Sequence, residues 1–282
     1  MNFHRQPNTY VSEVHLKISH LDQSIQFYKE IIGLKILTKT DKVAHLTADG
    51  KTTLVVLEEI NHPIRNTGRK TGLYHLALLL PNRMELANVL YHLLKSGYPL
   101  QGASDHLVSE ALYLGDPDGN GIEIYADRPE DTWKKNDGTI EMATHPLDAE
   151  DLLSQRSSET FIGLPSETIM GHIHLQVSSI QESEEFYQAL GFRAVNRYGH
   201  QALFISTGGY HHHIGLNTWQ SAGASAPTEN EVGLKTFTIT FPSDEERKAS
   251  IEKLEKIGAK ISLEDNQQIT FDPSKNKIIL SI

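Results

Sequence analysis

Histidines recur on one face of a strand-like stretch in this chain. In the segment 171–177, His172, His174 and Gln176 alternate with Ile173, Leu175 and Val177. Successive residues of a strand point to opposite faces, so the three polar side chains share one face. A strand that is buried only in an apolar core would not need polar side chains on its second face. The pattern therefore indicates a strand that borders a functional cavity.

A second histidine and a glutamate stand in similar surroundings. His75 lies within the apolar run LYHLALLLP, and Glu123 lies between Ile122 and Ile124 in DPDGNGIEIY. A carboxylate facing a cavity needs a partner, because an unpaired buried charge is costly. Either histidine alone would be an ordinary structural residue. Together, His75, Glu123 and His172 match the facial triad of two histidines and one carboxylate that binds a divalent metal.

Further residues could move protons. The run GGYHHHIGLNTW carries three adjacent histidines, His211 to His213, after a Gly-Gly turn signal. One of them could act as a general acid–base group directed into the cavity. Tyr113, shortly before the Glu123 stretch, is either a core aromatic residue or a hydrogen-bond donor to an anionic ligand oxygen. His106 precedes it on a predicted loop.

The elements that must position these residues form an internal repeat. ISHLDQSIQFY, from Ile18, matches VSSIQESEEFY, from Val177, and LYHLALLLP matches LKTFTITFP, from Leu234. Asp-Pro precedes the last apolar strand of each half, at 116–117 and 272–273. The chain therefore contains four units of about 50 residues, each with a strand, a helix and further strands.

Such units predict an α+β fold. One unit cannot bury both faces of its sheet, whereas two side by side can form a curved sheet with helices outside. We expect four βαβββ modules forming two curved-sheet cups. The expected domains are 9–127 and 168–282, each with two modules. The polar segment 128–167 is expected to be a linker with a short helix near Leu147 to Leu153.

Composition narrows the classes of function. The chain has 282 residues, a formal net charge of −10 and no cysteine. A protein that tracks nucleic-acid phosphates should carry a basic face, so we expect no nucleic-acid partner. Disulfides and thiolate metal sites are excluded. No apolar run reaches the length of a membrane span, and the N-terminus does not resemble a secretory signal. We expect a cytoplasmic protein with no membrane partner.

The motifs resemble those of a known superfamily. The four units and DPDGNGIE look like the vicinal oxygen chelate (glyoxalase/bleomycin resistance/extradiol dioxygenase) superfamily. LYHLALLLPNR, SEALYLGDPDGNGIEIYADRP and GGYHHHIGLNTW more closely resemble the bacillary catechol-2,3-dioxygenase (CatE-type) family. The resemblance spans nearly the whole chain. It implies a metal bound by His75, Glu123 and His172, with Fe(II) expected and Mn(II) or Zn(II) as alternatives.

The resemblance also implies catalytic roles. The acid–base histidine of the family precedes an apolar strand in a pattern that His212 matches, and the family's supporting tyrosine matches Tyr113. His106 matches a further family histidine only loosely, because its spacing differs. The implied activity is extradiol cleavage of catechol or a substituted catechol, with a small aromatic diol and O₂ as substrates. A homodimer is compatible with the sequence.

One departure concerns which units hold the metal. Many dioxygenases of this superfamily use their C-terminal half, but here the fourth unit has Thr236 and Ile279 at the ligand positions. Two assemblies remain. Units 2 and 3 could pair, using the triad above, or units 1 and 2 could pair, adding Glu13 or His15 to His75 and Glu123. We favour the first, because it uses the same position in each unit and leaves units 1 and 4 as a metal-free cup.

Two other functions are open on the same scaffold. A glyoxalase-type lyase or isomerase usually needs a second carboxylate as base, for which Glu13 is the candidate. A ligand-sequestering resistance protein would bind its ligand in the cups without a metal, and the metal triad disfavours it. The fold alone does not decide among these activities.

Overall fold

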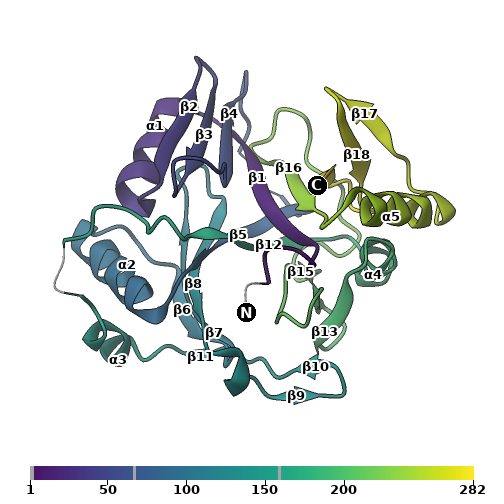
Figure 1. Cartoon of the computed structure of the whole chain (residues 1–282). Coiled ribbons are helices and arrows are strands. Elements are labelled where there is room, and N and C mark those ends of the chain that lie inside the picture. Colours follow the sequence, from purple (N-terminus) through teal and green to yellow (C-terminus); the bar gives the residue numbers. More distant parts are fainter. Residues whose placement is uncertain (1–2, 66–67, 158–159) are drawn as a thin grey trace.

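A computed structural model describes residues 3–65, 68–157 and 160–282 (Figure 1). The first two repeat units comprise β1 (Tyr10–Ile18), α1 (Leu21–Phe27) with a π-helical turn (Tyr28–Ile32), β2 (Lys35–Lys39), β3 (Val43–Thr47) and β4 (Val55–Glu59), then β5 (Gly72–Leu80), α2 (Arg83–Ser96), β6 (Gly102–Asp105), β7 (Ser109–Gly115) and β8 (Gly121–Asp127).

The last two units repeat this order. They comprise β12 (Ile169–Gln176), α4 (Ile180–Ala189), β13 (Arg193–Tyr198), β14 (Ala202–Ser206) and β15 (Ile214–Asn217), then β16 (Gly233–Thr240), α5 (Asp244–Lys256), β17 (Ser262–Glu264), β18 (Gln267–Phe271) and β19 (Lys277–Ser281). The connecting segment holds a 3₁₀ turn (Glu130–Thr132), β9 (Lys135–Asn136), β10 (Thr139–Ile140), β11 (His145–Pro146) and α3 (Ala149–Ser154). The predicted α+β class and the four modules are confirmed.

The modules pair across the two halves of the chain. A nine-stranded sheet has the order β11-β6-β7-β8-β5-β12-β15-β14-β13, which joins units 2 and 3. An eight-stranded sheet has the order β17-β18-β19-β16-β1-β4-β3-β2, which joins units 4 and 1. The favoured pairing of units 2 and 3 is confirmed. Each sheet thus combines one module from either predicted domain, 9–127 and 168–282.

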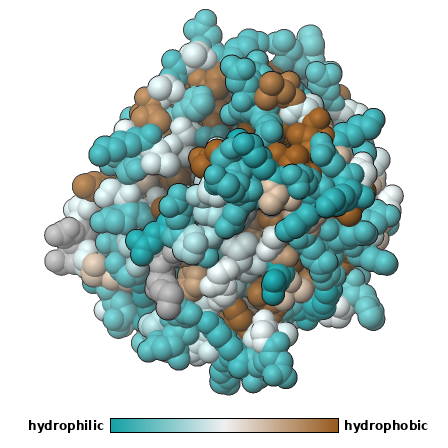
Figure 2. Space-filling model, turned by 45° about the vertical axis from the view of Figure 1, so that its right-hand side comes forward, coloured by the Kyte–Doolittle hydropathy of each residue, from teal (hydrophilic) through white to brown (hydrophobic). Residues whose placement is uncertain are grey.

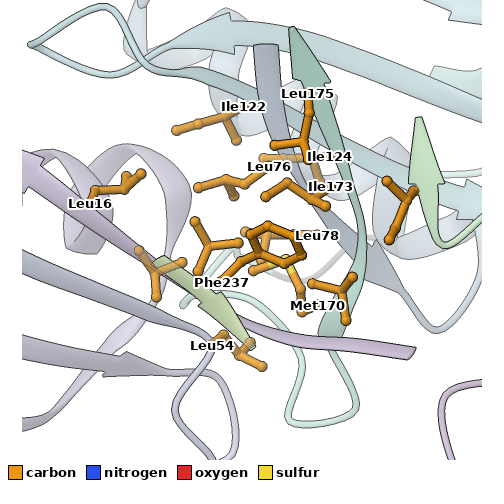
Figure 3. Close-up of a cluster of buried hydrophobic side chains, with 14 of the residues drawn as sticks. Leu16, Leu54, Leu76, Leu78, Ile122, Ile124, Met170, Ile173, Leu175 and Phe237 are labelled. Atoms are coloured by element: carbon orange, nitrogen blue, oxygen red, sulfur yellow. The ribbon is translucent and has the colours of Figure 1, made fainter. Parts of the chain in front are cut away.

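The two sheets share one apolar core. Alternation along the strands sends every second side chain inward, and Figure 3 shows these side chains converging from both sheets. Leu16 and Phe237 come from the eight-stranded sheet, and Leu76, Ile124 and Ile173 come from the nine-stranded sheet. All five are buried. The opposite faces of the sheets therefore lie outside this core.

Buried tyrosine–aspartate contacts join consecutive units. The Tyr28 hydroxyl donates to Asp116 Oδ2 at 3.2 Å, and in the other half the Tyr187 hydroxyl donates to Asp272 Oδ2 at 3.0 Å. These are the Phe-Tyr and Asp-Pro motifs of the repeat. Burial raises the pKa of both aspartates.

The helices gather at two sides of the molecule, α1 near α2 and α4 near α5 (Figure 1).

The connecting segment supplies one end strand of the nine-stranded sheet, β11, and contacts the other end strand, β13. β11 pairs with β6, and the Nδ2–H of Asn196 on β13 donates to the Ile140 carbonyl at 2.6 Å. The Tyr198 hydroxyl, also on β13, donates to the Met142 carbonyl at 2.8 Å. The segment 140–146 thus bridges the two ends of this curved sheet. The predicted linker helix is present as α3.

The molecular surface is largely hydrophilic on the face that Figure 2 shows. Figure 2 shows a face on which hydrophilic residues predominate and hydrophobic residues form smaller groups. No helix among the described residues has the length and apolar character needed to cross a membrane.

The last strand provides a test of which face is core. Ile278 is fully buried, whereas its neighbour Ile279 points to the other face and is partly exposed. We expect Ile278→Ala to lower the free energy of unfolding by about 2–5 kcal/mol, because it leaves a cavity in the shared core. Ile279→Ala should cost about 1 kcal/mol or less. Denaturant unfolding of both variants measures this, and an equal loss in the two would contradict the assignment of faces.

Candidate metal centre

Four neighbouring strands place a row of side chains across the nine-stranded sheet. Ala77 on β5 pairs with His172 on β12 and with Glu123 on β8. Glu123 in turn pairs with Tyr113 on β7. His75 lies two residues before Ala77 and therefore on the same face of β5. The register thus brings together residues that are far apart in the sequence, and the small Ala77 side chain leaves space between them.

The three predicted ligands form a compact buried group. Glu123 Oε2 lies 3.0 Å from His75 Nε2 and 3.2 Å from His172 Nε2, and the two Nε2 atoms are 3.4 Å apart. His75 is 7% exposed, Glu123 3% and His172 1%. Within the described residues, these three are the one group of His, Asp and Glu side chains close enough to hold a metal ion.

The pKa shifts of Glu123 and His172 favour the protonation states in which these side chains bind a metal. Burial alone would raise the pKa of Glu123, but His172 and His75 together hold it well below its usual range. Burial lowers the pKa of His172 to about 4. The carboxylate is therefore ionised and the His172 imidazole neutral at neutral pH. These are the protonation states that metal binding requires.

The spacing of these atoms fits a divalent metal. Ligand bonds of about 2.1 Å that meet at right angles place neighbouring donor atoms about 3.0 Å apart. The observed 3.0–3.4 Å agrees with this value. Two histidines and one carboxylate on one side of an ion leave positions free for further ligands. The residues present therefore fit a metal centre with open coordination positions.

Two members of the triad, His75 and Glu123, line a cavity of about 620 Å³. Its wall includes several aromatic rings, and His106, Tyr113, His174 and His212 also line it. The aromatic and apolar wall residues include Tyr74, Met142, Tyr198, Phe204 and Trp219. Among the described residues that line the cavity, none is Lys or Arg, and Glu123 is the one carboxylate. Such a cavity suits a flat, largely apolar ligand.

His212 is the member of the histidine run that lines this cavity. Its ring centroid lies 4.1 Å from that of His172. The Nε2–H of His211 donates to the Asp127 carboxylate at 2.8 Å, so a neutral His211 accepts at Nδ1. His212 Nδ1 lies 2.8 Å from that atom and donates to it. This chain of bonds leaves the Nε2 of His212 as a proton acceptor. His213 instead lies beside the Phe3 carbonyl.

Tyr113 and His106 form a hydrogen-bonded pair. The Nδ1–H of His106 donates to the Ala143 carbonyl at 2.7 Å, so its Nε2 accepts from the Tyr113 hydroxyl at 2.6 Å. Burial raises the pKa of Tyr113 well above its usual value, which keeps the phenol protonated. The hydroxyl hydrogen faces His106 here, so donation to a ligand requires the O–H bond to rotate.

The structure also separates residues that the sequence left as alternatives. Glu13 and His15 lie on β1 of the eight-stranded sheet, where His15 Nε2 is 2.9 Å from Glu58 Oε2. They cannot join His75 and Glu123. His174, for which the sequence predicts no role beyond a strand face shared with His172, also lines the cavity. Its alternation with His172 was the available signal.

Comparison with known proteins agrees with the fold and the motifs. The chain is 45% identical over 270 residues, or 94% of either chain, to a protein named catechol-2,3-dioxygenase from Bacillus subtilis (strain 168). A crystal structure of a putative dioxygenase from Bacillus subtilis subsp. subtilis str. 168 matches with a TM-score of 0.63 at 12% identity, covering 96% of this chain and 84% of that one.

A second solved structure carries a different name on the same fold. Glyoxalase I from Zea mays matches with a TM-score of 0.57 at 16% identity, over 96% of this chain and 92% of that chain. At these identities the solved structures show a shared fold. The model of the Glyoxalase/Bleomycin resistance protein/Dioxygenase superfamily matches residues 11–124 and 169–279. Together with the 45% identical relative, this match shows that the chain belongs to that superfamily, as the resemblance of its motifs predicted.

Proposed function

We propose that the chain is an extradiol dioxygenase that opens catechol or a substituted catechol beside its diol. The observation that carries the proposal is the buried His75–Glu123–His172 triad, of which His75 and Glu123 line a cavity together with His212, Tyr113 and His106. The relative's name, catechol-2,3-dioxygenase, supports the same activity. The proposed metal is Fe(II), with Mn(II) and Zn(II) as alternatives.

The triad would hold the metal, and the chain's other residues would handle the substrate. A metal bound there supplies Lewis acidity and open positions for the diol and O₂. The aromatic walls orient the flat ring and exclude water. His212 accepts a proton from a substrate hydroxyl at Nε2, since Asp127 and His211 direct its own proton to Nδ1. Because the protein holds the substrate ring and the His212 imidazole in place, the entropic cost of the reaction is lower.

Tyr113 and His106 would stabilise negative charge that develops on a substrate oxygen. Rotation of the Tyr113 O–H bond away from His106 would turn this donor toward the cavity, where its hydrogen bond would stabilise charge that develops in the transition state. The contact of His106 with the Ala143 carbonyl fixes which ring nitrogen faces Tyr113.

The cavity disfavours the glyoxalase-type alternative. A second carboxylate would be needed as base, and the described cavity wall has only Glu123, which the triad uses. Glu13, the earlier candidate, lies on the other sheet. The ring-cleaving activity is therefore the one that the arrangement supports best.

Metal binding provides the first test of this proposal. Glu123→Gln keeps the side chain's shape but removes the anionic ligand, so we expect metal content after aerobic or anaerobic loading to fall strongly. His172→Ala should lose the metal as well. His15→Ala is the matched control, because His15 lies on the other sheet. Elemental analysis of the purified variants measures this. Full metal content in His172→Ala would exclude the triad.

Proton transfer by His212 provides the second test. We expect His212→Phe to retain metal and catechol binding but to lower kcat by about 10²–10⁴-fold, the usual contribution of a general acid–base group. Catechol turnover is followed as a yellow ring-cleavage product and as O₂ consumption, on samples matched for metal content. Near-normal kcat in this variant would remove His212 from the mechanism. Absence of ring cleavage in the metal-loaded wild type would refute the proposed activity itself.

A further inference from the structure

Three residues of the GGYHHHIGLNTW motif that the mechanism does not use surround His174. Gly215 pairs with His174 across β12 and β15, and a Cβ on Gly215 would lie 2.9 Å from the Cγ of the His174 ring. Asn217 Nδ2 lies 3.1 Å from His174 Nε2. The Trp219 and His174 ring centroids are 5.6 Å apart. Gly215 therefore lets the imidazole lie close against β15 beside these partners.

The hydrogen bonds determine which nitrogen of His174 carries the proton. The backbone N–H of Trp219 can only donate, and it donates to Asn217 Oδ1 at 3.3 Å. This bond orients the Asn217 amide so that its Nδ2–H faces His174 Nε2 and donates to it. The neutral imidazole then carries its hydrogen on Nδ1. Within the described residues, that Nδ1 atom makes no hydrogen bond to the protein.

His174 stands in the cavity wall beside the metal triad. Its ring centroid lies 4.9 Å from that of His75 and 5.0 Å from that of Tyr74. Tyr74 and Trp219 are 43% exposed, so this part of the wall leads from the triad towards the cavity mouth. A catechol bound through its diol at the triad would extend its ring substituents along such a wall.

We propose that His174 is a substrate-contacting, specificity-determining residue, whose Nδ1–H donates a hydrogen bond to an acceptor atom on a ring substituent. This inference rests on the proposed ring-cleaving function and adds a substrate class. Because Lys and Arg are missing from the described cavity wall, the acceptor is neutral, such as an ether or carbonyl oxygen, rather than a carboxylate. Gly215 and Asn217 act through His174 as positioning residues.

A pair of matched ligands tests the hydrogen bond. Methoxycatechols and ethylcatechols, substituted at ring position 3 or 4, have nearly the same shape, and only the methoxy group offers an acceptor. Their dissociation constants are measured anaerobically by calorimetry on metal-loaded protein, and kcat/KM is measured in air. For at least one ring position, wild type should prefer methoxy over ethyl by roughly tenfold, the size of one hydrogen bond.

Two variants separate the hydrogen bond from packing. His174→Phe keeps an aromatic ring but lacks a donor, so the methoxy preference, measured as a ratio of the two ligands on one metal-loaded sample, should disappear. His174→Asn places an amide N–H near the position of Nδ1 and should restore part of the preference. An unchanged preference in folded, metal-loaded His174→Phe, or no preference in wild type at either position, overturns the inference.

The outcomes distinguish this inference from the proposed function. The anaerobic dissociation constants test His174 whether or not any ring is opened. Ring cleavage without a methoxy preference supports the proposed function and overturns the role of His174. A carboxylate catechol should bind wild type more weakly than its methyl ester, and tighter binding of the carboxylate would overturn the assignment of a neutral substituent.

Discussion

The site depends on the antiparallel pairing of β5 with β12. This ladder joins the first strands of units 2 and 3 and places His75 directly opposite His174, with His172 one step further along. The parallel pairing of β5 with β8 then adds Glu123 in line with Ala77. A shift of one residue in either ladder would turn its side chains to the core face and dissolve the triad. The shared apolar core opposes such a shift, because it would move the core-facing apolar side chains of the strand to the cavity face.

The same fold gives a different result where units 1 and 4 meet. His15 on β1 lies beside Glu58 rather than in a triad, and Lys235 Nζ lies 2.5 Å from the same carboxylate. A lysine ammonium thus supplies the positive charge that a metal would supply in the other cup. Thr236, which pairs with His15, and Ile279, which pairs with Thr238, have neither the imidazole nor the carboxylate that forms the triad. A few different side chains on the cavity face are therefore enough to give a metal centre in one sheet and an ion-paired group in the other. The core-facing residues maintain the same fold in both.

The sequence predicted most of the fold because its repeat and its strand alternation are local signals. Both are visible in the Phe-Tyr and Asp-Pro motifs, whose buried contact is made once in each half. The triad could be named because equivalent positions of different units carry ligand-type residues. The hydrogen-bonding of His212 through Asp127, and the contact of Asn217 with His174, could not be predicted. They depend on side-chain directions across strands that the repeat does not encode.

The connecting segment completes the cavity although it belongs to no repeat unit. Its residues 140–146 contact β13 at one end of the curved sheet and pair with β6 near the other end, and Met142, Ala143 and Thr144 line the cavity. The Ala143 carbonyl also decides which nitrogen of His106 faces Tyr113. A cup built only from the four modules would hold the triad but leave this pair without a fixed orientation. The segment that looks like a linker in the sequence therefore helps to set the chemistry, since it closes the sheet's open side and aligns a donor at the same time.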